Sequence, residues 1–125
     1  MKIFVTGGSG FVGKAFIRAM AGKHELVAMS RSESSDAKIK AAGATPVRCS
    51  LDDVSADQLT GVDAVMHCAA YVEEWGPWRA YWQANVEGTK RMLAAARKAG
   101  AKRFVHIGTE AALLKGQDLV NADES

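Results

Sequence analysis

Short apolar runs alternate with segments of helical periodicity along the chain. Apolar runs typical of buried strands occur at Lys2–Thr6, Glu25–Ser30, Thr45–Cys49, Ala64–Ala69 and Arg103–Ile107. The segments between them have the spacing or the capping residues of helices, and these are Gly10–Ala21, Ser34–Ala42, Ser55–Thr60 and Trp78–Ala99. This alternation predicts a parallel sheet whose strands are joined by helical crossovers.

The strand candidates are continuously apolar, as in the run Ala64-Val65-Met66, and do not alternate between apolar and polar residues. Strands of that kind are covered by helices on both faces of the sheet. We therefore predict an α/β fold. It is a Rossmann-type doubly wound parallel sheet with strand order 3-2-1-4-5, truncated after strand five, and residues 1–125 form one domain.

Glycines cluster where the first strand candidate passes into the first helix, in a segment that reads VTGGSGFVG from Val5 to Gly13. Such a turn lets the backbone approach a dinucleotide pyrophosphate, and the helix N-terminus offers N–H groups to it. Two registers fit, since either Gly7 or Gly8 can be the first glycine of the motif, and an ordinary strand–helix turn is the alternative interpretation. The predicted cofactor contacts are Gly7, Gly10, Phe11, Val12 and Gly13.

The end of the second strand candidate bears on the choice of nicotinamide cofactor. NAD-binding folds usually place a carboxylate about 20 positions beyond the glycines, where it holds the ribose 2′-hydroxyl. Here the chain reads Ser30, Arg31, Ser32. A guanidinium offers a 2′-phosphate a charge-assisted hydrogen bond, so these residues favour NADP over NAD. The alternative is that Arg31 is a solvated loop charge.

Composition and charge narrow the class of protein. The net charge is +2 over 125 residues, which gives no indication of a nucleic-acid or membrane partner. Cys49 and Cys68 lie near the ends of strand candidates three and four, roughly 14 Å apart in the predicted sheet, which is too far for a disulfide. We expect free thiols and a cytoplasmic protein. No His, Cys or Asp spacing indicates a metal site.

Further motifs follow in a fixed order, namely Ser50-Leu51-Asp52-Asp53, Val65-Met66-His67-Cys68-Ala69-Ala70, Asn85-Val86-Glu87-Gly88-Thr89 and the strand Arg103–Ile107 with Gly108-Thr109. Together with the segment from Thr6 to Gly13, they resemble the extended short-chain dehydrogenase/reductase family, the NAD(P)-dependent epimerase/dehydratase group. The segment from Tyr71 to Trp78 looks most like the branch with 3β-hydroxysteroid dehydrogenases and dihydroflavonol reductases.

The resemblance implies roles for particular residues. Ser50 and Leu51 would flank the adenine, and Thr109 would be the catalytic hydroxyl that binds a substrate alcohol or carbonyl. Asn85 would order the cofactor site. Further cofactor contacts would come from Cys68, Ala69 and Ala70. The chain departs from the family pattern at Ser50, where a carboxylate is common, and at Thr109, where serine is usual.

Several of these residues have a plainer interpretation. Asn85 lies inside an apolar helical stripe and is expected to be buried, and it could instead make a structural bond from the helix to a loop. Thr109 could be a turn threonine. His67 and His106 fall within strand candidates and are interpreted as core or cofactor-adjacent histidines. Tryptophans at 75, 78 and 82 either line a substrate pocket or pack in the core.

The proton donor of the resembled family, Tyr-x-x-x-Lys, is missing from these residues. Four positions beyond Tyr71 is Trp75, and four beyond Tyr81 is Asn85. We therefore expect the N-terminal part of a longer oxidoreductase or epimerase that acts on a small molecule, with little turnover by itself. The alternative is a complete, non-catalytic dinucleotide-binding or redox-sensing module. Family dimers suggest a homodimer through the helix near residues 78–99.

Overall fold

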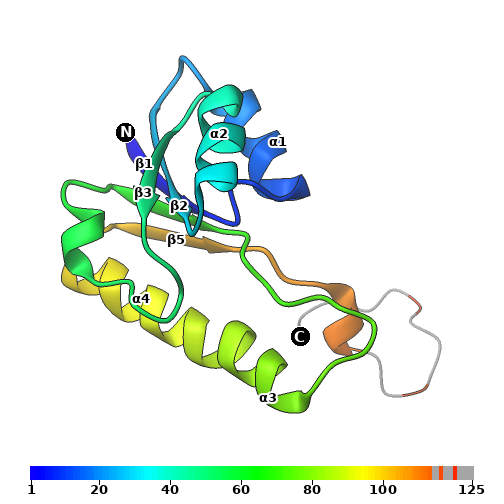
Figure 1. Ribbon diagram of the computed structural model, residues 1–125. Coiled ribbons are helices and arrows are strands. Elements are labelled where there is room, and N and C mark those ends of the chain that lie inside the picture. Colours follow the sequence, from blue (N-terminus) through cyan, green and yellow to red (C-terminus); the bar gives the residue numbers. More distant parts are fainter. Residues whose placement is uncertain (114–115, 117–119, 121–125) are drawn as a thin grey trace.

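Five parallel strands form a single sheet in the computed structural model, which describes residues 1–113, 116 and 120 (Figure 1). The strands are β1 (Lys2–Thr6), β2 (Glu25–Ser30), β3 (Thr45–Arg48), β4 (Ala64–His67) and β5 (Arg103–His106). They pair in the order β3-β2-β1-β4-β5, with every pair parallel. The predicted Rossmann-type sheet and its strand order are confirmed.

Strands β3, β4 and β5 end earlier than the apolar runs predicted. The predicted β4 continued to Ala69, but the N–H of Ala69 bonds to the side chain of Thr6, and the N–H of Cys68 is shared between that side chain and the Thr6 carbonyl. Cys49 and Ile107 likewise lie just beyond β3 and β5. The carboxyl ends of the strands therefore turn out of the sheet sooner than hydrophobicity alone indicates.

The first two crossover helices are α1 (Phe11–Met20) and α2 (Glu33–Ala42). Helix α2 begins one residue earlier than predicted, because Ser32 accepts the N–H of Ser35 and caps it. The predicted capping box of Ser55 and Gln58 is present, but it starts only a short 3-10 turn, η1 (Ala56–Leu59). A second 3-10 turn, η3 (Glu110–Leu113), follows β5.

The helix predicted from Trp78 to Ala99 is not uniform. It consists of α3 (Trp78–Tyr81), a π-helical segment η2 (Trp82–Glu87) and α4 (Gly88–Lys98). In the π segment the N–H of Gly88 bonds to the carbonyl of Gln83, five residues back. The extra residue in this turn rotates the side chains before it relative to those after it. A single apolar stripe therefore does not continue along the three segments.

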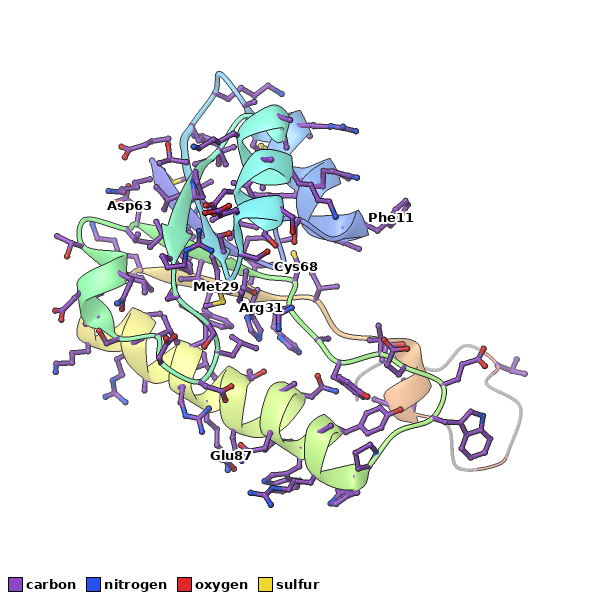
Figure 2. The ribbon with its side chains drawn as sticks, viewed as in Figure 1. Phe11, Met29, Arg31, Asp63, Cys68 and Glu87 are labelled. Carbon is purple, nitrogen blue, oxygen red and sulfur yellow. The ribbon has the colours of Figure 1, made fainter. Side chains whose placement is uncertain are left out.

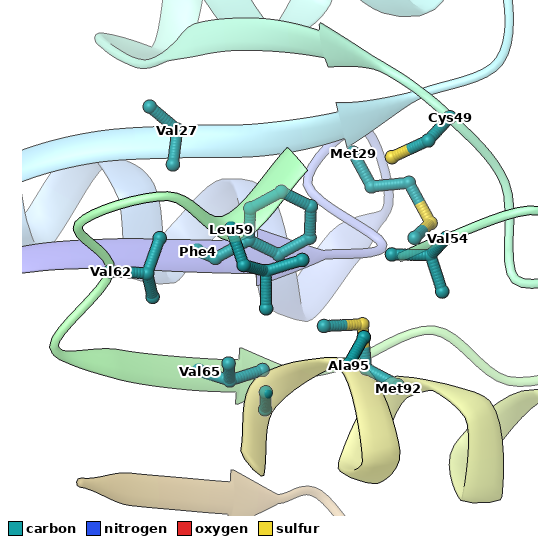
Figure 3. Close-up of a cluster of buried hydrophobic side chains, with 11 residues drawn as sticks. Phe4, Val27, Met29, Cys49, Val54, Leu59, Val62, Val65, Met92 and Ala95 are labelled. Atoms are coloured by element: carbon teal, nitrogen blue, oxygen red, sulfur yellow. The ribbon is translucent and has the colours of Figure 1, made fainter. Parts of the chain in front are cut away.

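Two hydrophobic clusters cover the two faces of the sheet, and Figure 3 shows the one that contains Phe4 and Met92. One face packs against α1 and α2 through Val5, Ile17 and Ile39, which are fully buried. The other packs against η1 and α4 and consists of Phe4, Val27, Met29, Cys49, Val54, Leu59, Val62, Val65, Met92, Ala95 and Ala96. Because neighbouring residues of β1 point to opposite faces, both are buried, as continuous apolar strands predict.

The expected helical stripes are only partly buried. In α1 the buried residues are Gly13 and Ile17, while Phe11 and Val12 are exposed. Trp75, Trp78 and Trp82 are also exposed, so their interpretation as aromatic core is wrong. Trp78 and Trp82, with Arg79 and Gln83, line an open pocket of about 410 Å³.

Candidate dinucleotide-binding site

The glycine turn between β1 and α1 is built from backbone atoms in close contact. Gly7 has a φ of +66°, and its carbonyl accepts the N–H of Gly10 at 2.9 Å. A Cβ on Gly13 would lie 2.3 Å from the Gly7 carbonyl oxygen. Gly8 is buried, where a Cβ would press on Ala28 and Ile17. The turn itself is therefore made by the Gly7, Gly10 and Gly13 register.

The N-terminus of α1 is open to an anion. Its N-cap is Gly10, no side chain caps the helix, and its first turn contains no acidic residue. The first N–H groups of a helix have no partner within it and favour negative charge. Phe11 and Val12 are exposed at this end of the helix, and Figure 2 shows Phe11. The turn fits the pyrophosphate of a dinucleotide, since its missing Cβ atoms allow the close backbone approach that the ligand needs.

The end of β2 presents a basic side chain beside a helix N-terminus. Ser30 is buried, and its hydroxyl donates to the carbonyl of Ser32 at 3.1 Å. The Ser32 hydroxyl accepts the N–H of Ser35 at 3.2 Å at the start of α2. Arg31 is exposed between them (Figure 2). Of the three predicted residues, Ser30 and Ser32 shape the turn, and Arg31 is the one that offers a charge to a ligand.

Thr6 organises the chain where β4 leaves the sheet. Its Oγ1 accepts the N–H groups of Cys68 and Ala69, at 3.1 and 3.0 Å, and lies 2.8 Å from Nδ1 of His67. Because these N–H groups use both lone pairs of the hydroxyl, its proton goes to Nδ1. The neutral His67 ring then carries its own proton on Nε2 and donates it to Oγ1 of Thr89, 3.0 Å away.

His67 is buried and uncharged at neutral pH. Burial, followed by the nearby charge of His106, lowers the pKa of His67 to about 4. The two rings stack with centroids 5.3 Å apart, and Phe104 lies 5.6 Å from His67. Both histidines fall within strands, as predicted. In this environment His67 holds the end of β4 in place through its two hydrogen bonds.

Acid should weaken the fold through His67. In the unfolded chain this histidine is protonated below about pH 6.5, whereas in the folded chain it stays neutral down to about pH 4. The free energy of unfolding should therefore fall as pH drops between these values, by about 3 kcal/mol in total. Urea unfolding of wild type and His67→Gln at several pH values measures this. The fall in the free energy of unfolding on acidification should be absent from His67→Gln and present in His24→Gln. The same pH dependence in all three proteins would contradict its assignment to His67.

Asn85 is exposed, so the prediction of a buried amide is wrong. The π segment turns this residue toward the loop after β4 and away from the core. Its Oδ1 accepts the N–H of Tyr71 at 2.8 Å and its Nδ2 donates to the Tyr71 carbonyl at 3.0 Å. Tyr81 also binds this loop, through its hydroxyl and the carbonyl of Glu73. The structural bond from helix to loop is present, and through it Asn85 fixes the chain that follows Ala70.

Thr109 follows β5 at the carboxyl edge of the sheet. The N–H of Ile107 bonds to the His67 carbonyl at 3.0 Å, which joins the chain ends after β4 and β5. Two residues later, the carbonyl of Thr109 accepts the N–H of Ala112, which lies within η3, and Thr109 is exposed. This places Thr109 at the same edge of the sheet as the glycine turn, where ligands of open α/β sheets bind.

Both cysteines are free thiols, as predicted. Burial, with a smaller contribution from Asp53, raises the pKa of Cys49 to about 11, and burial also raises the pKa of Cys68. Neither thiol is activated as a nucleophile at neutral pH. Among the described residues, no group of three or more His, Cys, Asp or Glu side chains is placed to bind a metal ion. Nor does any helix in that part of the chain have the length and apolarity to span a membrane.

Sequence reasoning missed the residues that hold the site together. Thr6 and Thr89 reach His67 from positions 61 and 22 residues away, so no local pattern reports the contact. Arg91 contacts the loop after β3, 40 residues away in sequence. The sequence offers one signal for Thr6 and Thr89, which is that each is a hydroxyl residue within a motif. Thr6 directly precedes the glycine turn, and Thr89 ends the motif that begins at Asn85.

Known proteins resemble the chain over its whole length. A ketoreductase of Stigmatella aurantiaca, which acts on 4-hydroxy-2-methyl-3-oxo-4-farnesyl-3,4-dihydroquinoline-1-oxide, is 38% identical over 100% of this chain and 38% of its own length. A 2-alkyl-3-oxoalkanoate reductase of Stenotrophomonas maltophilia is 39% identical over 87% of this chain and 33% of its own length. The chain therefore spans well under half of these relatives.

Relatives and solved structures agree on the fold. The UDP-glucuronic acid 4-epimerase of Bacillus cereus, solved with NAD, superimposes with a TM-score of 0.81 at 23% identity, over 99% of this chain and 44% of that one. Further relatives are named 3-beta-hydroxysteroid dehydrogenase and putative dihydroflavonol 4-reductase, as the loop after β4 indicated. The model described as "NAD dependent epimerase/dehydratase family" matches residues 3–125. With a five-stranded Rossmann sheet and a closely packed glycine turn after β1, the chain belongs to the NAD-dependent epimerase/dehydratase family.

Proposed function

We propose that the chain is the NADP-binding part of an NAD(P)-dependent oxidoreductase or epimerase that acts on a hydroxyl or carbonyl group. The observation that carries this is the uncapped N-terminus of α1 behind a turn in which Gly13 has no room for a side chain. When bound, the nicotinamide supplies or removes a hydride. The names of the two reductases at 38 and 39% identity support reduction of a ketone.

Each candidate residue has a role in this proposal. Gly7, Gly10 and Gly13 hold the pyrophosphate, and Ser50 and Leu51 flank the adenine. The loop after β4 carries Cys68, Ala69 and Ala70 past the ribose on the nicotinamide side, where Asn85 and Thr6 fix its path. Thr109 hydrogen-bonds the substrate oxygen from the end of β5.

The proton donor lies outside these residues in this proposal. Neither Tyr71 nor Tyr81 is followed by lysine four positions on, and Tyr81 already donates its hydroxyl proton to the Glu73 carbonyl. We further propose a cytoplasmic enzyme that forms a homodimer. The exposed Trp78, Trp82 and Leu93 along the helical segments support such an interface.

Arg31 should decide the choice of cofactor. One charge-assisted hydrogen bond to the 2′-phosphate contributes about 1.5–3 kcal/mol, so NADP+ should bind about ten- to a hundredfold more tightly than NAD+. Arg31→Leu should abolish this preference and leave the affinity for NAD+ unchanged. Calorimetric titration of both cofactors into both proteins measures it.

Arg18→Leu is the matched control for this titration, because it removes the same charge from the last turn of α1, at the other end of that helix from the glycine turn. Its preference for NADP+ should equal that of wild type. Wild type that binds NAD+ as tightly as NADP+ would overturn the NADP assignment alone. Wild type that binds neither dinucleotide would overturn the proposed function.

A further inference from the structure

The turn after β3, residues 50–53, has a shape of its own. Oδ1 of Asp53 accepts both the N–H of Ser50, at 2.5 Å, and its hydroxyl, at 2.9 Å. These bonds hold the pKa of Asp53 below its usual range. The N–H of Asp52 in turn bonds to the Ser50 hydroxyl at 3.2 Å. The turn is therefore closed by bonds within itself, and its position depends on what it rests against.

Helix α4 supplies that support. Nη1 of Arg91 donates to the carbonyl of Leu51 at 3.1 Å and lies 3.2 Å from Oδ1 of Asp52. One helical turn earlier, a Cβ on Gly88 would come within 3.0 Å of the Leu51 side chain. Gly88 thus lets the turn approach the helix, and Arg91 bonds it there. Charge-assisted hydrogen bonds of this kind are about twice as strong as neutral ones.

The turn lies beside the end of β2, because the N–H of Cys49 bonds to the carbonyl of Ser30 at 3.3 Å. Arg31 follows at once. Within the turn, the Asp53 carboxylate is bonded to Ser50 and the Asp52 carboxylate is paired with Arg91. The groups of this turn that remain available to the adenine of the cofactor are its backbone atoms and the half-buried Leu51 side chain. Recognition of the adenosine half then depends on where this backbone is held.

We propose that Arg91 is a positioning residue for the adenosine half of the cofactor. Arg91 does not touch the ligand in this proposal, and it acts by holding residues 50–53 against α4 before binding. A site that is held in its bound shape loses less free energy when the ligand arrives. The inference rests on the proposed function, since it assumes that the adenosine binds between this turn and the end of β2.

The test uses the full-length protein and two probes, NADP+ and 2′-phospho-ADP-ribose, which lacks the nicotinamide. Arg91→Leu should raise the dissociation constants of both probes by about tenfold, with the calorimetric stoichiometry unchanged. Arg91→Lys keeps the charge and should recover part of the affinity. A merely structural defect would lower the stoichiometry and the melting temperature and leave the dissociation constant of the folded fraction unchanged.

Two further variants separate the contacts. Arg97→Leu removes the same charge from an exposed position of α4 and should change affinity less than twofold. Asp52→Asn removes the ion pair, leaves the Leu51 carbonyl bond, and should cost less than threefold. Equal losses in Arg91→Leu and Arg97→Leu would assign the effect to net charge and overturn the inference.

The outcomes also separate this inference from the proposed function. Wild type that binds the probes, together with Arg91→Leu within twofold of it, overturns the inference alone. Wild type that binds neither probe overturns both. If Arg91→Leu does not fold, Arg91→Lys decides, because a threefold or larger rise in its dissociation constants supports the role and wild-type affinity contradicts it.

Discussion

Gly13→Ala should destabilise the fold and remove dinucleotide binding together. The new Cβ would lie 2.3 Å from the Gly7 carbonyl oxygen and 2.8 Å from its carbon. Both neighbours are backbone of a turn that already bonds Gly10, so neither can rotate away. Alanine gains about 1 kcal/mol in a helix, whereas overpacking a rigid site costs about 1–3 kcal/mol and occasionally more. Because a contact of 2.3 Å with rigid backbone lies at the upper end of that cost, we expect a net loss of about 2 kcal/mol in the free energy of unfolding.

Binding should suffer more than stability. To admit the methyl group, Gly7 and the N-terminus of α1 must move apart, which displaces the N–H groups that would hold the pyrophosphate. We expect affinity for NADP+ to fall by at least about a hundredfold. Urea unfolding and calorimetric titration measure the two effects.

Gly108→Ala is the control for stability, since a Cβ there meets no atom within 4 Å. It should change the free energy of unfolding by less than about 1 kcal/mol. If Gly13→Ala kept the stability and the affinity of wild type, the contact between residue 13 and the Gly7 carbonyl would be less tight than in the structure.

The sheet and the glycine turn were predictable because their signals are local. Lys2–Thr6 and Glu25–Ser30 each begin and end on a polar residue, and they match β1 and β2 at both ends. The register of the glycines was left open, because sequence spacing cannot tell that Gly8 packs under the turn while Gly7 takes the positive φ. Only the positions of the neighbouring chains distinguish the two.

The helix from residue 78 to 99 shows where local signals fail. Periodicity places Asn85 on the apolar side, and an unbroken α-helix would bury it there. Its two hydrogen bonds to Tyr71 draw it outward, and the π turn allows this while Thr89 and Met92 still face the sheet. A bond between residues 14 positions apart thus overrides the helical pattern. The same holds for Arg91 and Leu51, which nothing in the sequence brings together.

Thr6→Val should cause the largest loss of stability among these variants. It preserves the shape of the side chain but deletes the oxygen that joins β1 to the end of β4. The N–H of Ala69 loses its acceptor and Nδ1 of His67 loses its donor, while the N–H of Cys68 keeps the backbone carbonyl of Thr6 at 3.3 Å. Each buried polar group left unpaired costs about 1–3 kcal/mol, so we expect a loss of about 4 kcal/mol. That is a large fraction of the 5–15 kcal/mol typical of a domain.

Thr6→Ser separates the hydrogen bonds from the packing. Serine keeps the hydroxyl and loses one buried methyl group, so the free energy of unfolding should fall by only about 1 kcal/mol. A larger loss in Thr6→Ser than in Thr6→Val would show that the methyl group, which valine keeps, and not the oxygen, holds the strands together. The acid sensitivity assigned to His67 should remain in Thr6→Val, because burial is the main cause of its low pKa and the ring stays buried. Urea unfolding at pH 7 and pH 5 measures both effects, since the valine variant should lose the same further stability on acidification as wild type.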